Sequence, residues 1–166
     1  MTLVLYLGGA RSGKSRLALA RAAAAGKPVV FVATGEALDD EMAERIARHR
    51  EERPSGWATF EEPLELGRAL EQAPAAATVV VDCLSLWVAN VFERSPAEQL
   101  ADAAAGLAAA RPGLTVAVSN EVGLGIVPDN ELARRYRDVL GRVNATWAAA
   151  ADEAYLVVAG RSLRLA

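Results

Sequence analysis

Short apolar runs alternate with longer alanine-rich or amphipathic segments along the chain. The apolar runs are rich in β-branched residues, which is typical of buried strands in a parallel sheet, whereas the longer segments consist of helix formers. The pattern predicts strands at residues 3–7, 28–33, 78–82, 114–118 and 154–158. It predicts helices at residues 13–25, 38–53, 64–70, 84–91, 95–110 and 129–151. This alternation indicates an α/β fold.

Four segments add detail to this pattern. Residues 57–63 are expected to form a short strand or a loop, and the apolar helix at 84–91 belongs either to the core or to a subunit contact. The Ser-Pro-Ala-Glu sequence at 95–98 is a capping box with proline at the first helical position. Residues 162–165 are expected to pair back after a turn as an antiparallel edge strand.

The junction between the first strand and the first helix carries the most specific motif. It fits the pattern G-x-x-x-x-G-K-[ST] with Gly8, Gly9, Ala10, Arg11, Ser12, Gly13, Lys14 and Ser15. In this context successive backbone N–H groups and the helix dipole attract phosphate. Lys14 can then reach the β- and γ-phosphates, and Ser15 can hold Mg²⁺. A chance match in a glycine-rich turn is the alternative, and the strand and helix on either side disfavour it.

Polar residues also follow other predicted strands. Asp82 comes after four β-branched residues, which is the arrangement of a Walker-B aspartate that holds Mg²⁺; an ordinary aspartate at a strand end is the alternative. The tripeptide Thr34-Gly35-Glu36 either faces the same crevice or forms a simple turn. The pair Asn120-Glu121 lies at the end of the fourth predicted strand.

The only histidine of the chain is His49. It lies three residues after Ile46 and seven after Met42, near the apolar stripe of its helix, where a lone histidine is usually a packed structural residue. Charged residues surround it: Arg48, Arg50, Glu51, Glu52 and Arg53. The arginines are suited to phosphate and favour a functional histidine, unless they form a solvated face paired with the acids. Further along, Glu61 either accepts hydrogen bonds from a nucleotide or starts the next helix.

Composition narrows the class of protein. With 166 residues, we expect a single nucleotide-binding domain over residues 1–166. The net charge of −3 argues against a nucleic-acid partner or an anionic membrane surface. A single cysteine, Cys83, fits a reducing compartment. Without a signal-peptide pattern or a run long enough to span a membrane, the expected location is the cytoplasm.

Together these features predict a three-layer α/β P-loop NTPase fold of the RecA-like type, with a mostly parallel sheet and an antiparallel C-terminal edge. The motifs indicate a nucleoside triphosphate and Mg²⁺, but they leave open which phosphate bond is broken. A switch GTPase is disfavoured, because Ser119-Asn120-Glu121-Val122 stands where a guanine-reading N-K-x-D motif would follow the fourth strand.

Several motifs, in order along the chain, resemble those of the bifunctional adenosylcobinamide kinase / adenosylcobinamide-phosphate guanylyltransferase family. The matching segments are residues 8–15, 38–42, 45–46, 49–50, 53–54, 57–61, 120–128 and 141–144. These motifs are spaced over almost the whole chain, and the alanine-rich stretch at residues 90–113 is the part that has no match. One such motif would be weak evidence, whereas the ordered set is specific.

The resemblance implies two reactions. A nucleoside triphosphate, ATP or GTP, phosphorylates adenosylcobinamide; GTP then donates GMP to adenosylcobinamide phosphate, giving adenosylcobinamide-GDP and pyrophosphate. It further implies that His49 carries the guanylyl group as a covalent intermediate, with Lys14 and Mg²⁺ neutralising phosphate charge. Guanosine recognition would fall to Thr34, Gly35, Glu36, residues 50–53, Glu61 and Asp82.

The resemblance also implies a homo-oligomer, a trimer in the family, for which Trp87, Val88 and Val91 are candidate contacts. Residues 122–128 are a candidate wall for the corrinoid. The alternatives are a P-loop small-molecule kinase that transfers only the γ-phosphate and a nucleotide-sensing module without turnover.

Overall fold

A computed structural model describes residues 2–37, 39–51 and 53–165. The elements in chain order are β1 (Thr2–Gly8), α1 (Lys14–Ala24), β2 (Val29–Ala33), α2 (Asp40–Glu51), β3 (Ala58–Glu61), α3 (Leu66–Gln72), β4 (Thr78–Asp82), α4 (Leu84–Val91), α5 (Ala97–Ala110), β5 (Leu114–Asn120), α6 (Glu131–Ala150), β6 (Glu153–Val158) and β7 (Arg161–Leu165). The predicted strands and helices are confirmed. Two positions of the predicted helix at 38–53, Leu38 and Glu52, lie outside the described residues.

The sheet has seven strands in the order β3-β2-β4-β5-β1-β6-β7. Every pairing is parallel except the last, in which β7 runs antiparallel to β6 and forms the predicted edge. The register pairs Gly8 with Asn120, Val118 with Asp82, and Asp82 with Ala33. The carboxyl ends of β1, β5, β4 and β2 therefore meet along one side of the sheet.

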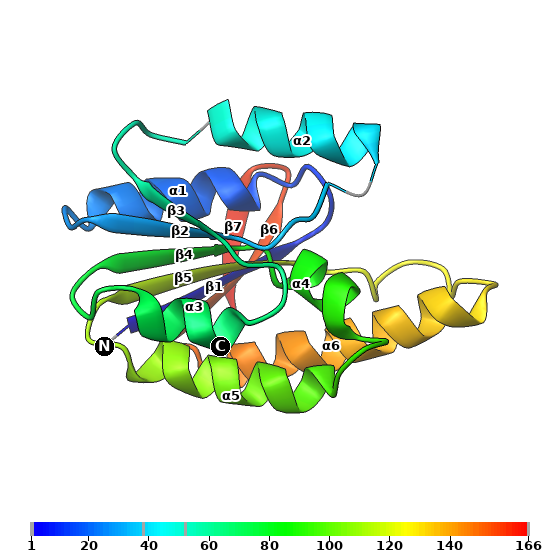
Figure 1. The fold of residues 1–166 in the computed structure, drawn as a ribbon. Coiled ribbons are helices and arrows are strands. Elements are labelled where there is room, and N and C mark those ends of the chain that lie inside the picture. The colour runs from blue at the N-terminus through cyan, green and yellow to red at the C-terminus, as the bar shows by residue number, and fades with distance from the viewer. Residues whose placement is uncertain (1, 38, 52, 166) are drawn as a thin grey trace.

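Helices cover both faces of the sheet, as Figure 1 shows: α1 and α2 lie on one side, and α3, α5 and α6 on the other. The larger core lies on the second side and contains the fully buried Trp87 and Trp147. The buried residues of α5 are all alanines: Ala97, Ala101, Ala104, Ala105 and Ala108. Small side chains let this helix approach its neighbours closely.

Two sequence-based expectations are wrong in detail. Trp87, Val88 and Val91 are at most 2 % exposed and belong to the core, so they are not subunit contacts. The capping box at 95–98 does not form, because Pro96 occupies the N-cap position of α5 and no side chain caps the helix. Glu98 instead accepts a hydrogen bond from Arg142 of α6 at 2.7 Å.

A buried arginine connects the ends of α3 and α5. The guanidinium of Arg111 donates hydrogen bonds to the carbonyl oxygens of Leu70 (2.6 Å), Ala73 (3.1 Å), Pro74 (2.8 Å) and Ala77 (3.3 Å). These carbonyls belong to the end of α3 and the connection to β4. Helix C-termini leave carbonyl oxygens without intrahelical partners, and Arg111 supplies those partners from a neighbouring helix end.

We expect Arg111→Ala to lower the free energy of unfolding by about 3 kcal/mol, because it removes four hydrogen bonds from a charged, buried donor. Urea denaturation measures this loss as a lower midpoint at an unchanged slope. Arg142→Ala is the control; its ion pair with Glu98 is exposed, so its loss should stay below about 1 kcal/mol. Equal effects of the two substitutions would contradict the structural role of Arg111.

Candidate active site

A pocket of about 440 Å³ lies at the carboxyl ends of the parallel strands, beside α2. Its polar lining comes from α1, the segment after β2, α2 and the segment after it, and the ends of β3, β4 and β5: Lys14, Ser15, Glu36, His49, Arg50, Arg53, Glu61, Asp82 and Asn120. Residues that are far apart in the sequence therefore share one cavity, whose size is typical of a small-molecule site.

The predicted phosphate loop occupies the turn between β1 and α1. Gly13 precedes α1 with φ 96°, which is a left-handed conformation that glycine adopts without strain. A Cβ at Gly8 would lie 2.5 Å from the carbonyl oxygen of Val157, so this position has no room for a side chain. The Lys14 ammonium is largely buried and donates to the carbonyl oxygen of Gly9 at 3.0 Å. The loop is thus folded around its lysine.

The two predicted metal ligands lie next to each other. Ser15 Oγ donates to Asp82 Oδ1 at 3.5 Å, across the ends of α1 and β4. Burial raises the pKa of Asp82, and positive charge at His49, Lys14 and Arg53 opposes that rise. A hydroxyl and a carboxylate are hard oxygen donors, which fits a Mg²⁺ ion that takes its other ligands from water and phosphate. The described residues contain no cluster of three or more acidic, histidine or cysteine side chains for a metal.

The apolar stripe of α2 faces the pocket. Met42, Ile46 and His49 all line it, and none of the described side chains of α2 is fully buried. Figure 1 shows α2 on the α1 side, at the outside of the fold. The same stripe that could have packed into a core therefore forms a wall of the cavity, and it places the only histidine opposite the phosphate loop.

The arginines after His49 have specific partners. Arg50 forms an ion pair with Glu61, the last residue of β3. Arg53 lies over the ring of Phe31, with Cζ 3.9 Å from the centroid, and its Nη1 donates to Thr59 Oγ1 at 3.4 Å. Burial lowers the pKa of Arg53. Both arginines are held at the edge of the pocket, so the alternative of a purely solvated arginine face does not describe them.

Of the predicted phosphate loop, only Lys14 and Ser15 line the pocket. Among the other predicted residues that the structure describes, Thr34 and Glu51 do not line it. Thr34 is buried; its hydroxyl donates to the carbonyl oxygen of Cys83 at 2.7 Å and accepts from the Cys83 amide at 2.9 Å, which ties the end of β2 to that of β4. Glu51 is exposed outside the pocket lining. Glu52 lies outside the described residues.

The apolar lining of the pocket was not predicted from the sequence: Phe31, Ala33, Ala37, Ala43, Ala47, Pro63, Cys83 and Leu86. Ala43 and Ala47 could have been found, because Ala43 lies three residues before Ile46 and four before Ala47, so these side chains neighbour one another on the helix. The other positions look like ordinary core residues in the sequence. Only the folded chain shows which apolar side chains border a cavity.

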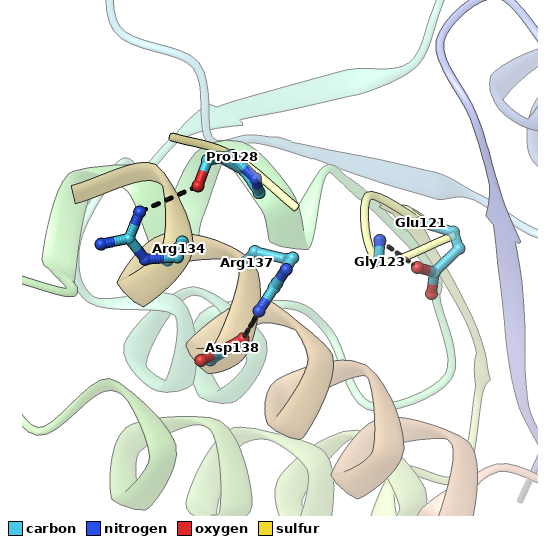
Figure 2. A network of polar contacts seen from close by, with 6 residues as sticks. All are labelled: Glu121, Gly123, Pro128, Arg134, Arg137 and Asp138. Atoms are coloured by element: carbon cyan, nitrogen blue, oxygen red, sulfur yellow. Dashed lines mark hydrogen bonds and ion pairs between the residues drawn. The ribbon is translucent and has the colours of Figure 1, made fainter. Parts of the chain in front are cut away.

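The loop after β5 connects that strand to α6. Its apolar side chains are largely exposed, with Leu124 at 83 %, Ile126 at 99 % and Val127 at 61 %. Figure 2 shows that both ends of the loop are held: Glu121 accepts from the Gly123 amide at 2.5 Å, and Arg134 Nη1 donates to the carbonyl oxygen of Pro128 at 2.9 Å. The loop therefore displays its apolar residues on an anchored segment.

The fold and the site together define a P-loop nucleotide-binding protein. The phosphate loop follows the first strand of a parallel sheet in this order, and an aspartate at a strand end lies beside the loop serine. Comparison with known proteins gives the family. The chain belongs to the cobinamide kinase / cobinamide phosphate guanyltransferase (CobU) family, whose model matches residues 4–165.

Relatives match over nearly the whole chain. The bifunctional adenosylcobalamin biosynthesis protein CobP of Pseudomonas aeruginosa is 44 % identical, and the match covers 97 % of this chain and 95 % of that protein. The corresponding CobU proteins are 42 % identical in Salmonella typhimurium (98 % and 99 % covered) and 39 % identical in Escherichia coli (98 % and 99 % covered). The family and these relatives are thus bifunctional enzymes of adenosylcobalamin biosynthesis.

Solved structures of more distant proteins share the fold. The flagellar accessory protein FlaH of Methanocaldococcus jannaschii matches with a TM-score of 0.55 and 13 % identity, over 97 % of this chain and 74 % of that one. A KaiC-like protein of Pyrococcus horikoshii matches with a TM-score of 0.50 and 15 % identity, over 93 % and 70 %. These similarities agree with the predicted P-loop fold. In the described part of the chain no helix combines the length and apolar character needed to cross a membrane.

We expect Asp82→Asn to stabilise the nucleotide-free protein at neutral pH, because asparagine keeps an acceptor for Ser15 without a buried charge. Burial raises the pKa of Asp82 in the folded protein above its ordinary value. The protonated acid therefore contributes stability that is complete below the ordinary pKa of aspartate. This stability is lost as the pH rises through the raised pKa of the folded state. The melting temperatures of variant and parent should therefore separate with rising pH and converge below about pH 4.

Thermal unfolding between pH 3 and pH 8, without nucleotide or Mg²⁺, measures this difference. Asp102→Asn, at an exposed site on α5, is the matched control and should follow the parent protein. If Asp82→Asn melts at a lower temperature than the parent protein at pH 7, burial of the Asp82 carboxylate does not destabilise the nucleotide-free protein.

Proposed function

We propose that this protein phosphorylates adenosylcobinamide with a nucleoside triphosphate and then transfers GMP from GTP to adenosylcobinamide phosphate, through a guanylyl group on His49. One observation carries the proposal: a single pocket is lined both by the phosphate-loop lysine, Lys14, and by the only histidine of the chain. Family membership supports the identity of the substrates.

The phosphate end of the nucleotide binds at the loop between β1 and α1. Backbone N–H groups of residues 8–13 surround the phosphates, and Lys14 places its charge beside the β- and γ-phosphates. Ser15 and Asp82 would hold Mg²⁺, which neutralises developing charge on the phosphate oxygens when it is bound. The cationic side chains that face Asp82 also favour its ionised, metal-binding form.

His49 acts as the nucleophile in the second reaction. An unprotonated imidazole nitrogen attacks the α-phosphorus of GTP, an N–P bond forms, and the bond to the β-phosphate oxygen breaks to release pyrophosphate. A phosphate oxygen of adenosylcobinamide phosphate then attacks the same phosphorus. The N–P bond breaks, and adenosylcobinamide-GDP leaves with the imidazole regenerated.

The guanosine lies toward β3 and α2 in this proposal. Glu36, Arg50, Arg53 and Glu61 line this part of the pocket and offer carboxylate acceptors and guanidinium donors for the base and ribose. Gly35 supports them by leaving space, since a Cβ there would lie 3.3 Å from Leu86 Cδ1. Thr34 contributes by joining the ends of β2 and β4, whereas Glu51 lies outside the pocket lining.

The acceptor is larger than the pocket. A corrinoid bound to a cavity of about 440 Å³ that also holds GTP must extend over the surrounding surface. The anchored apolar loop at residues 122–128 begins directly after the pocket residue Asn120 and is our candidate for that surface. We further propose that the enzyme is a cytoplasmic homo-oligomer, and its resemblance to the family implies a trimer.

Intact mass after incubation with GTP and Mg²⁺ tests the function. We expect the protein to gain one GMP unit and His49→Ala to gain none, because no other histidine is present. Arg48→Ala, an exposed change on the same helix, should still form the adduct. Phosphorylation of adenosylcobinamide without any adduct would favour a simple kinase, and nucleotide binding without turnover would favour a sensing module. An acid-labile adduct that persists in His49→Ala would refute the assignment of His49.

Ile126→Ser tests the acceptor surface. Burial of an isoleucine side chain against a ligand contributes about 1.5 kcal/mol, so the KM for adenosylcobinamide phosphate should rise about tenfold, while GMP adduct formation stays unchanged. Leu163→Ser is the matched control, as an exposed apolar residue on β7. An unchanged KM combined with a smaller oligomer by light scattering would instead identify the loop as a subunit contact.

A further inference from the structure

The carboxyl end of β5 brings one more polar side chain into the pocket. Asn120 lines the cavity together with Lys14, Ser15 and Asp82, and none of the roles described so far uses it. Because β5 lies between β1 and β4, Asn120 is paired with Gly8, the first residue of the phosphate loop. The side chain therefore enters the pocket between the loop and the strand that carries Asp82.

Buried hydrogen bonds hold the backbone at this point from two directions. The amide of Glu121 donates to the carbonyl oxygen of Gly8 at 3.1 Å, and Asn144 Nδ2 donates to the carbonyl oxygen of Asn120 at 3.0 Å. Asn144 is only 5 % exposed, and its Oδ1 accepts from Ser119 Oγ at 2.6 Å. A buried amide is costly unless its hydrogen bonds are satisfied, so this arrangement places the end of β5 accurately.

The side chain of Asn120 is left available for a ligand. It is half-buried, and it makes no hydrogen bond to residues 2–37, 39–51 or 53–165. Its carboxamide can donate to a phosphate oxygen without adding charge to the site. An acidic side chain at the same place would repel phosphate.

The orientation of the nucleotide follows from the position of His49. If His49 attacks the α-phosphorus, the α-phosphate points toward α2 and the terminal phosphate points away from it. In the sheet order β3-β2-β4-β5-β1, Asn120 lies on the β1 side of Asp82, whereas β3 and Glu61 lie on the opposite side. Asn120 is therefore placed at the terminal-phosphate end.

We propose that the Asn120 side-chain amide donates a hydrogen bond to the terminal phosphate of the bound nucleoside triphosphate, and that Asn144 is the positioning residue that holds it there. The inference rests on the proposed function for the direction in which the triphosphate lies. It also gives a role to the sequence motif at residues 141–144, although α6 lies on the other side of the sheet from α2 (Figure 1).

The test compares affinities for GTP and GDP, measured by calorimetry with Mg²⁺ in a His49→Ala background so that no transfer consumes GTP. Asn120→Ala should weaken GTP binding about tenfold and leave GDP binding unchanged, because the lost bond goes to a charged group that only GTP carries. Asn120→Asp should lose more GTP affinity than Asn120→Ala. Asn144→Ala should also lower the preference for GTP over GDP, but by less than Asn120→Ala does.

Asn130→Ala is the matched control. It removes the N-cap of α6, where Asn130 Oδ1 accepts from the Ala133 amide at 2.7 Å, so it perturbs the same helix without changing the ratio of the two affinities. Equal losses for GTP and GDP in Asn120→Ala, or no loss for either, would overturn the proposal. If the protein with His49 intact forms the GMP adduct but Asn120→Ala leaves the ratio of GTP to GDP affinity unchanged, only the role of Asn120 is refuted. If the protein forms no adduct but Asn120→Ala changes this ratio, only the transfer of GMP is refuted.

Discussion

The parallel pairing of β5 between β1 and β4 is the constraint on which the site depends. Parallel strands end at the same edge of a sheet, so the residues that follow β1, β2, β4 and β5 meet although they are far apart in sequence. The phosphate loop, Thr34, Asp82 and Asn120 are brought together in this way. A shift of one residue in this register would turn alternate side chains to the opposite face and would separate Ser15 from Asp82.

The electrostatics of the pocket follow from that convergence. Asp82 lies among protein atoms that disfavour its charge, and the cationic groups around it come from α1, α2 and the segment before β3. Such a site is suited to a ligand that carries its own negative charge together with a divalent cation. The bound cation and phosphates would complete this arrangement of charges, because the groups around Asp82 offset only part of the cost of burying its carboxylate.

The two sides of the sheet have different tasks. The side with α3, α5 and α6 holds most of the large buried side chains. Alanines line the packed face of α5, and Arg111 donates hydrogen bonds to carbonyl oxygens at the end of α3. On the other side, α2 turns its apolar stripe toward a cavity. The Asn144 and Ser119 hydrogen bonds join the two sides, because a residue of α6 holds the strand end that faces the nucleotide.

Much of the molecule was predictable from local information. The period of the apolar residues predicted the elements, and the loop at residues 8–15 predicted a phosphate site, because both signals lie within short stretches of chain. Three features depended on the tertiary structure: whether Trp87 was core or contact, which partner Glu98 would take, and that Asn120 stands beside Gly8. These features depend on strand order and on the competition between distant partners. The chain by itself therefore determined the kinds of chemistry available, and only the packing of the sheet decided which of those groups share one pocket.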